Sequence, residues 1–114
     1  MTLIYKILPA AEWQEVQAKG RFDGSAIDLR DGYIHFSTAA QAQETGRKYF
    51  SGMADLMVLA VEGESLGPAL KWEPSRGGDL FPHLYGPLPV SAVKQAFAVT
   101  FGADGAPELS DLAP

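Results

Sequence analysis

The chain has 114 residues, of which 46% are apolar and 20% charged, a size and composition typical of one globular domain rather than a disordered segment. It contains no cysteine, which excludes disulfides, thiolate metal sites and thiol nucleophiles, and it has no apolar run of the ~18 residues that a membrane-spanning helix needs, so we expect a cytoplasmic protein without a membrane partner. The formal net charge of −5 with scattered Arg and Lys disfavours nucleic acid as a partner and favours a small molecule or another protein.

The first elements along the chain are a strand and a helix. Residues 3–8 predict a strand with Tyr5 and Ile7 on one face and Ile4, Lys6 and Leu8 on the other, where Lys6 is an unexpected charge on a face that should be covered. Residues 10–19 predict a helix that ends at Gly20. Residues 21–30 have mixed polarity and predict a loop with one or two turns.

A second strand is predicted at residues 33–37, because its side chains alternate between apolar and polar. The polar face of this strand carries Tyr33, His35 and Ser37. Neighbours on one face of a strand lie about 7 Å apart, which suits a ligand with several hydroxyl groups. A structural histidine that only satisfies a hydrogen bond is the alternative for His35.

A second helix is predicted from Thr38 to about Phe50, since Thr38 and Gln41 match a capping box. The strand and this helix are joined with almost no loop. Ser37 and Thr38 therefore lie where free backbone N–H groups collect, which predicts an anion-binding corner.

The second half of the chain contains four predicted strands, at residues 56–61, 70–73, 80–85 and 92–101. The first is continuously apolar, which indicates a central strand, and Pro82 indicates an edge or a bulge in the third. The order predicts a single α+β domain, residues 1–102, with mostly antiparallel sheets and two helices. Residues 103–114 predict a loose tail.

The segment from Gly77 to Pro87 is the most motif-like stretch, because an imidazole, a carboxylate and a phenol lie between glycines and prolines. His83 either contributes to a site or bonds a loop carbonyl. Glu73 is either a solvated charge or a carboxylate that orients a ribose or a nucleophile. Arg76 is a solvated charge or a phosphate contact.

Several familiar sites are absent from the sequence. The two histidines are far apart and the acids are dispersed, so we expect no metal ion. The sequence has neither the Gly-x-Ser-x-Gly elbow of a serine hydrolase nor a P-loop with its lysine.

The chain resembles a family of small bacterial proteins known as domain of unknown function 952, over about residues 3–97. The resemblance is carried by Ile4-Tyr5-Lys6-Ile7, Glu12-Trp13, the segment from Asp31 to Thr38, Leu70-Lys71-Trp72-Glu73 and the segment from Gly77 to Leu88. That family is in turn similar to the ADP-ribosyltransferase fold, and above all to tRNA 2′-phosphotransferases, which act on NAD.

The second resemblance implies a cleft that binds NAD or ADP-ribose and transfers an ADP-ribosyl or phosphoryl group. It implies catalytic roles for His35, His83 and Glu73. It implies cofactor contacts from Lys6, Tyr33, Ser37, Thr38, Arg76 and Tyr85. Lys6 takes the place of a histidine on the first strand, so a binding module without turnover, or a protein-interaction module, is the alternative.

Overall fold

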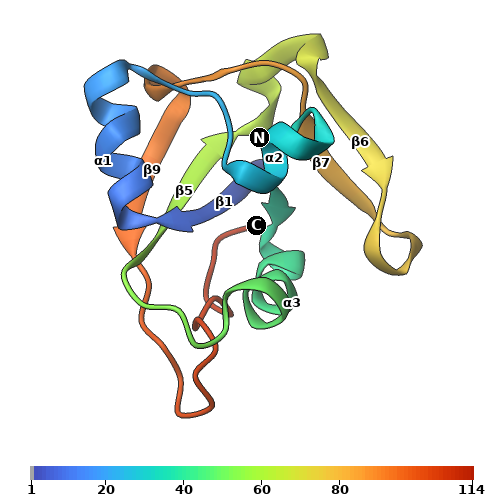
Figure 1. Cartoon of the computed structure of the whole chain (residues 1–114). Coiled ribbons are helices and arrows are strands. Elements are labelled where there is room, and N and C mark those ends of the chain that lie inside the picture. Colours follow the sequence, from blue (N-terminus) through green and yellow to red (C-terminus); the bar gives the residue numbers. More distant parts are fainter. Residues whose placement is uncertain (1) are drawn as a thin grey trace.

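The computed structural model describes residues 2–114, which form one body with three antiparallel sheets (Figure 1). The largest sheet has the strand order β4-β1-β5-β9, a second has the order β3-β7-β6, and the third pairs β2 with β8. The strands are β1 (Leu3–Pro9), β2 (Arg21–Phe22), β3 (Ile34–His35), β4 (Ser37–Thr38), β5 (Leu56–Glu62), β6 (Leu70–Pro74), β7 (Leu80–Leu84), β8 (Leu88–Pro89) and β9 (Val93–Ala98).

The helices of the described chain are α1 (Ala10–Lys19), α2 (Ala26–Asp31) and α3 (Ala39–Phe50), with 3-10 turns η1 (Gly63–Ala69), η2 (Arg76–Gly78) and η3 (Val90–Ala92). Within residues 2–114, none of them is long and apolar enough to cross a membrane. The α+β class with antiparallel sheets is thus confirmed.

The ends of the two longer helices follow the local sequence signals. Gly20 ends α1 in the left-handed conformation, with φ of 89°, and its N–H bonds the Val16 carbonyl. Thr38 begins α3 through a capping box with Gln41. Both helices were predicted from these residues, and both predictions are confirmed.

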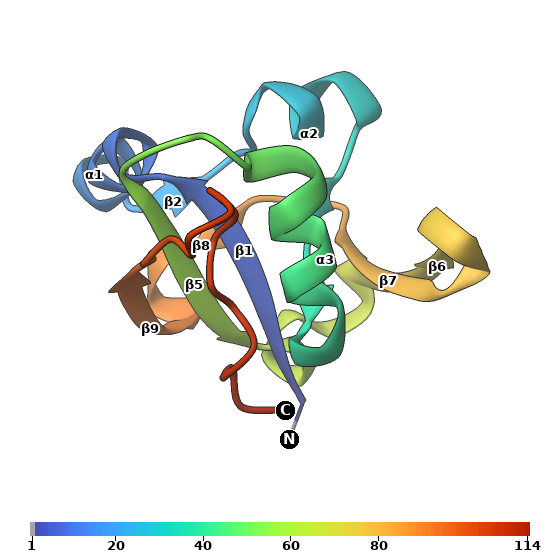
Figure 2. The same cartoon turned by 90° about the horizontal axis from the view of Figure 1, so that it is seen from below.

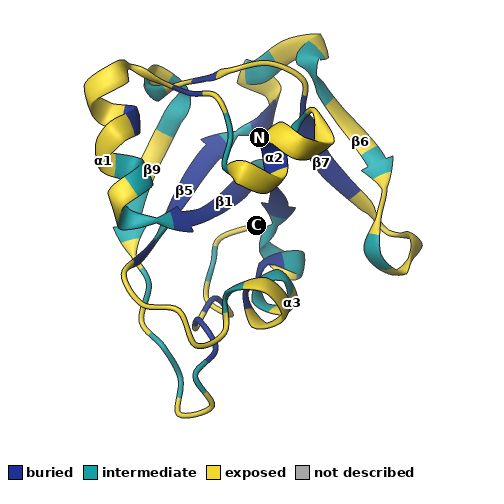
Figure 3. Ribbon diagram, viewed as in Figure 1, coloured by how far each residue is buried: buried dark blue, intermediate teal, exposed yellow. Residues whose placement is uncertain are grey.

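The two faces of the largest sheet pack into separate cores. Ile4 and Leu8 of β1 face a core that includes residues of α1 and the second sheet, whereas Tyr5 and Ile7 face α3 and the C-terminal segment. Figure 2 shows α3 and the last residues on the same side of β1 and β5. In Figure 3 the strands β1, β5 and β7 are the buried centre of the molecule, and the helices expose their outer sides.

The prediction of a loop at residues 21–30 is wrong, because this stretch contains β2 and the helix α2. Ser25 begins α2 through a capping box with Asp28, and Gly32 ends the helix with φ of 89°. In Figures 1 and 2, α2 lies between α1 and β7, at the junction of the two larger sheets.

The prediction that Pro82 marks an edge or a bulge is also wrong, because β7 is the central strand of its sheet and pairs with β6 without a register shift. A proline has no N–H to donate, but its carbonyl still accepts a bond from Phe36 N at 3.0 Å. The neighbouring β3 is only two residues long, so the missing donor lies beside the point where that strand ends.

The C-terminal segment, residues 103–114, is packed rather than loose. Leu109 is 2% exposed in the core beneath α3. Gln43 of α3 bonds two backbone groups of the segment, accepting from Leu109 N at 2.6 Å and donating to the Pro107 carbonyl at 2.8 Å. The prediction of a loose tail was based on the weak periodicity of residues 103–114. Periodicity cannot reveal this packing, because the segment is held by the amide of one side chain and a few apolar contacts.

We expect Leu109→Ala to lower the free energy of unfolding by about 2–4 kcal/mol, because it empties a buried leucine site. Urea denaturation followed by circular dichroism measures this change. Leu29→Ala is the matched control, since Leu29 is 65% exposed and should change stability by less than about 0.5 kcal/mol. Equal effects of the two substitutions would show that the segment does not contribute to the core.

Candidate functional site

The two histidines, remote in sequence, meet on one face of the second sheet. The short strand β3 pairs antiparallel with β7, and this register places His35 directly opposite His83. Residues opposite each other in such a pair project to the same face. Their ring centroids are 5.5 Å apart in an edge-on arrangement.

Tyr33 lies in the middle of an aromatic cluster that also contains His35, His83 and Tyr85. Its ring centroid is 4.1 Å from that of His83, 4.6 Å from that of His35 and 5.2 Å from that of Tyr85. Burial raises the pKa of the Tyr33 phenol, so this hydroxyl keeps its proton near neutral pH. The cluster therefore combines stacked ring faces with polar atoms at their edges.

Glu73 connects two members of the aromatic cluster through a single carboxylate oxygen. Its Oε1 accepts from the Tyr85 hydroxyl at 2.7 Å and lies 2.9 Å from His83 Nδ1. The Tyr85 bond, followed by the His83 bond, lowers the pKa of Glu73. The same bond raises the pKa of Tyr85 to about 12. Both bonds within residues 2–114 fall on Oε1, so Oε2 of this partly exposed side chain faces solvent.

Asp28 of α2 occupies the other side of the cluster and is 1% exposed. Its Oδ1 lies 2.6 Å from His35 Nδ1 and accepts from His35 N at 3.1 Å. Its Oδ2 lies 2.8 Å from Lys6 Nζ and accepts from Ser25 N at 2.9 Å. Burial alone would raise the pKa of Asp28, but the His35 bond and the Lys6 charge outweigh it and lower the pKa from 3.8 to about 2.

The second nitrogen of His35 also faces a carboxylate, since Nε2 lies 3.0 Å from Asp31 Oδ2. A carboxylate can only accept, so a neutral His35 ring donates to one of these two carboxylates and an imidazolium ring donates to both. In the described chain every buried side-chain nitrogen or oxygen has a partner, and the only bond found to the ring of His83 is at Nδ1. His83 is buried, at 3% exposure, beneath the Tyr33 ring, and its Nε2 has no hydrogen-bond partner among the described residues.

Lys6, predicted to contact a cofactor, is 5% exposed and lies beneath Asp28. Burial lowers the pKa of its ammonium, and the Asp28 charge opposes that effect. In this structure Lys6 reaches Asp28 and not the surface of the aromatic cluster.

Ser37 and Thr38, also predicted to bind a cofactor, lie at the start of α3 instead. The Ser37 hydroxyl donates to Thr45 Oγ1 at 3.0 Å and is buried. Thr38 N donates to the Gln41 side chain at 3.0 Å, and Gln41 N donates to Thr38 Oγ1 at 3.2 Å. The capping box therefore satisfies two of the N–H groups that the predicted anion-binding corner would have offered to a ligand.

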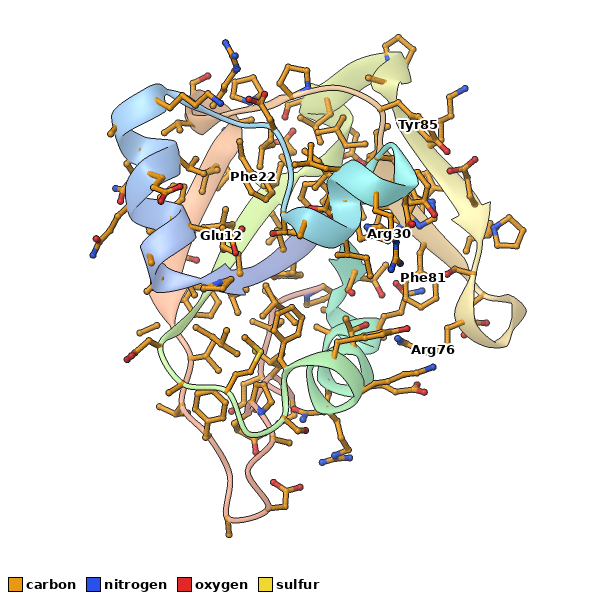
Figure 4. The ribbon with its side chains drawn as sticks, viewed as in Figure 1. Glu12, Phe22, Arg30, Arg76, Phe81 and Tyr85 are labelled. Atoms are coloured by element: carbon orange, nitrogen blue, oxygen red, sulfur yellow. The ribbon has the colours of Figure 1, made fainter. Side chains whose placement is uncertain are left out.

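Arg76 lies near the same end of α3 and apart from the imidazoles. Its guanidinium carbon is 4.9 Å from the centre of the Phe81 ring, and it donates to Thr45 Oγ1 at 3.1 Å. Figure 4 shows Arg76 beside Phe81, with Tyr85 toward the opposite end of the β6 and β7 pair. Of the predicted residues, the structure brings Tyr33, His35, Glu73, His83 and Tyr85 together and places Ser37, Thr38 and Arg76 in a separate group.

Asp28 and Asp31 were not among the predicted site residues. The spacing from Ser25 to Asp28 is that of a capping box, which could have predicted α2 and placed both acids on a short helix just before the strand that carries His35. Gly77 and Gly78 belong to the motif-like segment that begins before β7. Both have positive φ, 72° and 85°, and an added Cβ would meet nothing within 4 Å, so they serve the turn between β6 and β7.

Two cavities lie away from the aromatic cluster. One of about 380 Å³ lies between the largest sheet and the C-terminal segment, and includes Tyr5, Phe97 and Leu112 in its lining. The other, of about 390 Å³, is lined by residues that include Gly63, Leu70 and Trp72. Neither cavity is lined by Tyr33, His35, His83 or Tyr85, and the chemistry of these side chains makes the aromatic cluster the candidate site.

Comparisons with known proteins agree on one family. The model of the family described as Protein of unknown function (DUF952) matches residues 7–96. The chain is similar to protein CC0527 from Caulobacter crescentus: the crystal structure is 59% identical with a TM-score of 0.95, covering 96% of each chain. The solution NMR structure of CC0527 is 59% identical with a TM-score of 0.88, covering 97% of this chain and 96% of that one. No curated protein matches the chain.

The lowered pKa of Asp28 predicts a loss of stability in acid. Because the folded value is about 2 and the ordinary value is 3.8, the carboxylate stabilises the fold above about pH 4 and loses that effect as the pH falls toward 2. The free energy of unfolding of the wild type should exceed that of Asp28→Asn by roughly 2 kcal/mol less at pH 2 than above pH 4.

Urea denaturation at a series of pH values measures that difference. Asp79→Asn is the control, because Asp79 is exposed and its difference from wild type should stay flat across the same window. A difference for Asp28→Asn that does not change with pH would contradict the role assigned to this ion pair.

Proposed function

We propose that this chain, which belongs to the DUF952 family, binds NAD or a related ADP-ribose nucleotide at the aromatic cluster and transfers its ADP-ribosyl group. The observation that carries the proposal is the Glu73 carboxylate. One of its oxygens is fixed by His83 and Tyr85, and the other has no hydrogen-bond partner among the described residues on a side chain that is 36% exposed. We also propose that the fold is related to that of the ADP-ribosyltransferases, a resemblance that supports the same class of ligand.

The parts of a nicotinamide nucleotide correspond to groups in the cluster. The faces of Tyr33 and Tyr85 offer stacking for a flat heteroaromatic ring. Glu73 Oε2 offers an acceptor for ribose hydroxyls, which donate readily to carboxylates. A site with apolar ring faces and a few fixed polar atoms is typical of small-molecule recognition.

The chemistry proposed for the site is displacement at the nicotinamide ribose. The bond between C1′ and the nicotinamide nitrogen breaks, and nicotinamide leaves with the bonding electron pair. Positive charge develops at C1′ and is stabilised by the ionised Glu73. The oxygen of an acceptor hydroxyl then bonds C1′, and its proton passes to His83 Nε2, the imidazole nitrogen without a protein partner.

A second candidate is nucleotide binding without turnover. It is favoured by His35, both of whose ring nitrogens face carboxylates, so that only one imidazole can accept a proton. It is also favoured by Lys6, which is sealed beneath Asp28 and cannot itself contact a phosphate. Release of nicotinamide from NAD separates this candidate from the first.

We expect NAD and ADP-ribose to raise the melting temperature, because a ligand that binds only the folded state stabilises it. Glu73→Gln should weaken binding measured by calorimetry by about tenfold, since it removes a charged acceptor. Glu15→Gln is the matched control, as Glu15 is exposed on α1 and should leave binding unchanged.

Two outcomes would contradict the proposal. If NAD, ADP-ribose, AMP and nicotinamide all leave the melting temperature of the wild-type protein unchanged, the cluster is not a nucleotide site. If NAD binds and Glu73→Gln binds it as tightly as Glu15→Gln does, the nucleotide lies elsewhere on the molecule. Chromatography of the reaction mixture for free nicotinamide tests turnover separately.

A further inference from the structure

We propose that Asp28 is a positioning residue for His35, and that Lys6 contributes to the site through Asp28 rather than by touching a ligand. Asp28 is 1% exposed and lies behind the His35 imidazole. It would therefore act on a ligand through His35 and not by direct contact. This role concerns the orientation of the His35 ring. Of the experiments below, only the NAD-binding measurement rests on the proposed nucleotide function.

The bonds of Asp28 divide between two tasks. Oδ2 accepts from Ser25 N at 2.9 Å, which is the capping bond at the start of α2. Oδ1 accepts from the backbone N–H of His35 at 3.1 Å and lies 2.6 Å from its ring Nδ1. Lys6 Nζ bridges the two oxygens, at 2.8 Å from Oδ2 and 3.1 Å from Oδ1. The capping bond uses Oδ2 alone, so the contacts of Oδ1 with His35 are additional to helix capping. Two bonds to one residue, from its backbone and its ring, fix the ring plane as well as its position.

The ammonium of Lys6 compensates the negative charge of the buried Asp28 carboxylate. It lies on β1 between Ile4 and Leu8, whose side chains belong to an apolar core. An isolated charge there would be costly, and pairing at 2.8 Å offsets that cost for both groups. The ammonium therefore keeps Asp28 ionised as an acceptor for the Nδ1 proton of His35.

The two carboxylates on His35 differ in how easily a ligand could replace them. Asp28 is sealed and lies 2.6 Å from Nδ1, whereas the side chain of Asp31 is 30% exposed and lies 3.0 Å from Nε2. A ligand hydroxyl or phosphate oxygen would displace Asp31 and accept a hydrogen bond from His35 Nε2–H. His35 then acts as a fixed donor, which leaves proton acceptance to His83.

The charged groups around His35 come from several elements. Asp28 and Asp31 face it from α2, and Lys6 stands behind Asp28 on β1. His83 lies opposite it on β7, paired with Glu73 of β6. A change in Asp28 can therefore be separated from changes at the other carboxylates by observing the two imidazoles individually.

Nitrogen-15 NMR of the imidazoles tests the positioning role without any ligand. The chain has two histidines, so the spectrum contains two ring systems. In the wild-type protein at pH 6, we expect His35 to show a slowly exchanging Nδ1 proton shifted downfield by its short bond. Asp28→Asn should abolish that signal, and Asp31→Asn should preserve it while changing Nε2. The His83 signals should stay unchanged in both variants and report that the fold is intact.

The positioning role is overturned if the wild-type His35 shows no protected Nδ1 proton, a result that needs no variant to fold. It is equally overturned if Asp28→Asn leaves the His35 signals as they are. In the binding arm, Asp28→Asn and His35→Gln should each weaken NAD binding about tenfold, and the double variant should be no weaker than either. If NAD does not bind the wild-type protein but the NMR result holds, the nucleotide proposal fails and the positioning role stands.

Discussion

The ion pair between Lys6 and Asp28 is the constraint on which the candidate site depends. Both charges are buried, at 5% and 1% exposure, and both are removed from water on folding. Such a pair adds little net stability compared with apolar packing, but any arrangement that separates its members leaves an uncompensated buried charge. The pair thus fixes α2 against β1, and with it the carboxylate that holds His35.

The register between β3 and β7 is the second constraint. Pairing of His35 with His83 and of Ile34 with Leu84 puts both imidazoles on one face and both aliphatic side chains in the core. A slip by one residue would move the imidazoles into the core and the aliphatic residues to the cluster. The burial of Ile34 and Leu84 therefore enforces the juxtaposition of the histidines, although neither aliphatic residue contacts the polar atoms of the site.

The sequence predicts those parts of the fold that depend on neighbours along the chain. The ends of α1 and α3 follow from Gly20 and from the Thr38 capping box, and the faces of β1 follow from its alternation. Membership of the family was also predicted and is confirmed. The helix α2 was missed because six residues are too few for a helical period to show.

The candidate site was predicted only in part, because its geometry depends on long-range pairing. The residue types of His35, Glu73 and His83 were recognised, but nothing local indicates that Glu73 bonds His83 across two strands. The partner of Lys6 lies 22 positions away in a stretch that had been interpreted as a loop. A charge in an apolar strand implies a buried partner on physical grounds, yet the sequence offers several acids and does not indicate which one.

The two imidazoles have the same residue type but different surroundings, and the difference suggests a division of roles. His35 lies between two carboxylates, one at each ring nitrogen, whereas His83 has a carboxylate at Nδ1 and no hydrogen-bond partner at Nε2 among the described residues. The two carboxylates that contact Nδ1 of these rings, Asp28 and Glu73, are kept ionised by different neighbours. Asp28 relies on a buried ammonium and Glu73 on the Tyr85 hydroxyl and partial exposure. The proposed transfer reaction uses this difference, with His35 as a hydrogen-bond donor to the ligand and His83 as the proton acceptor.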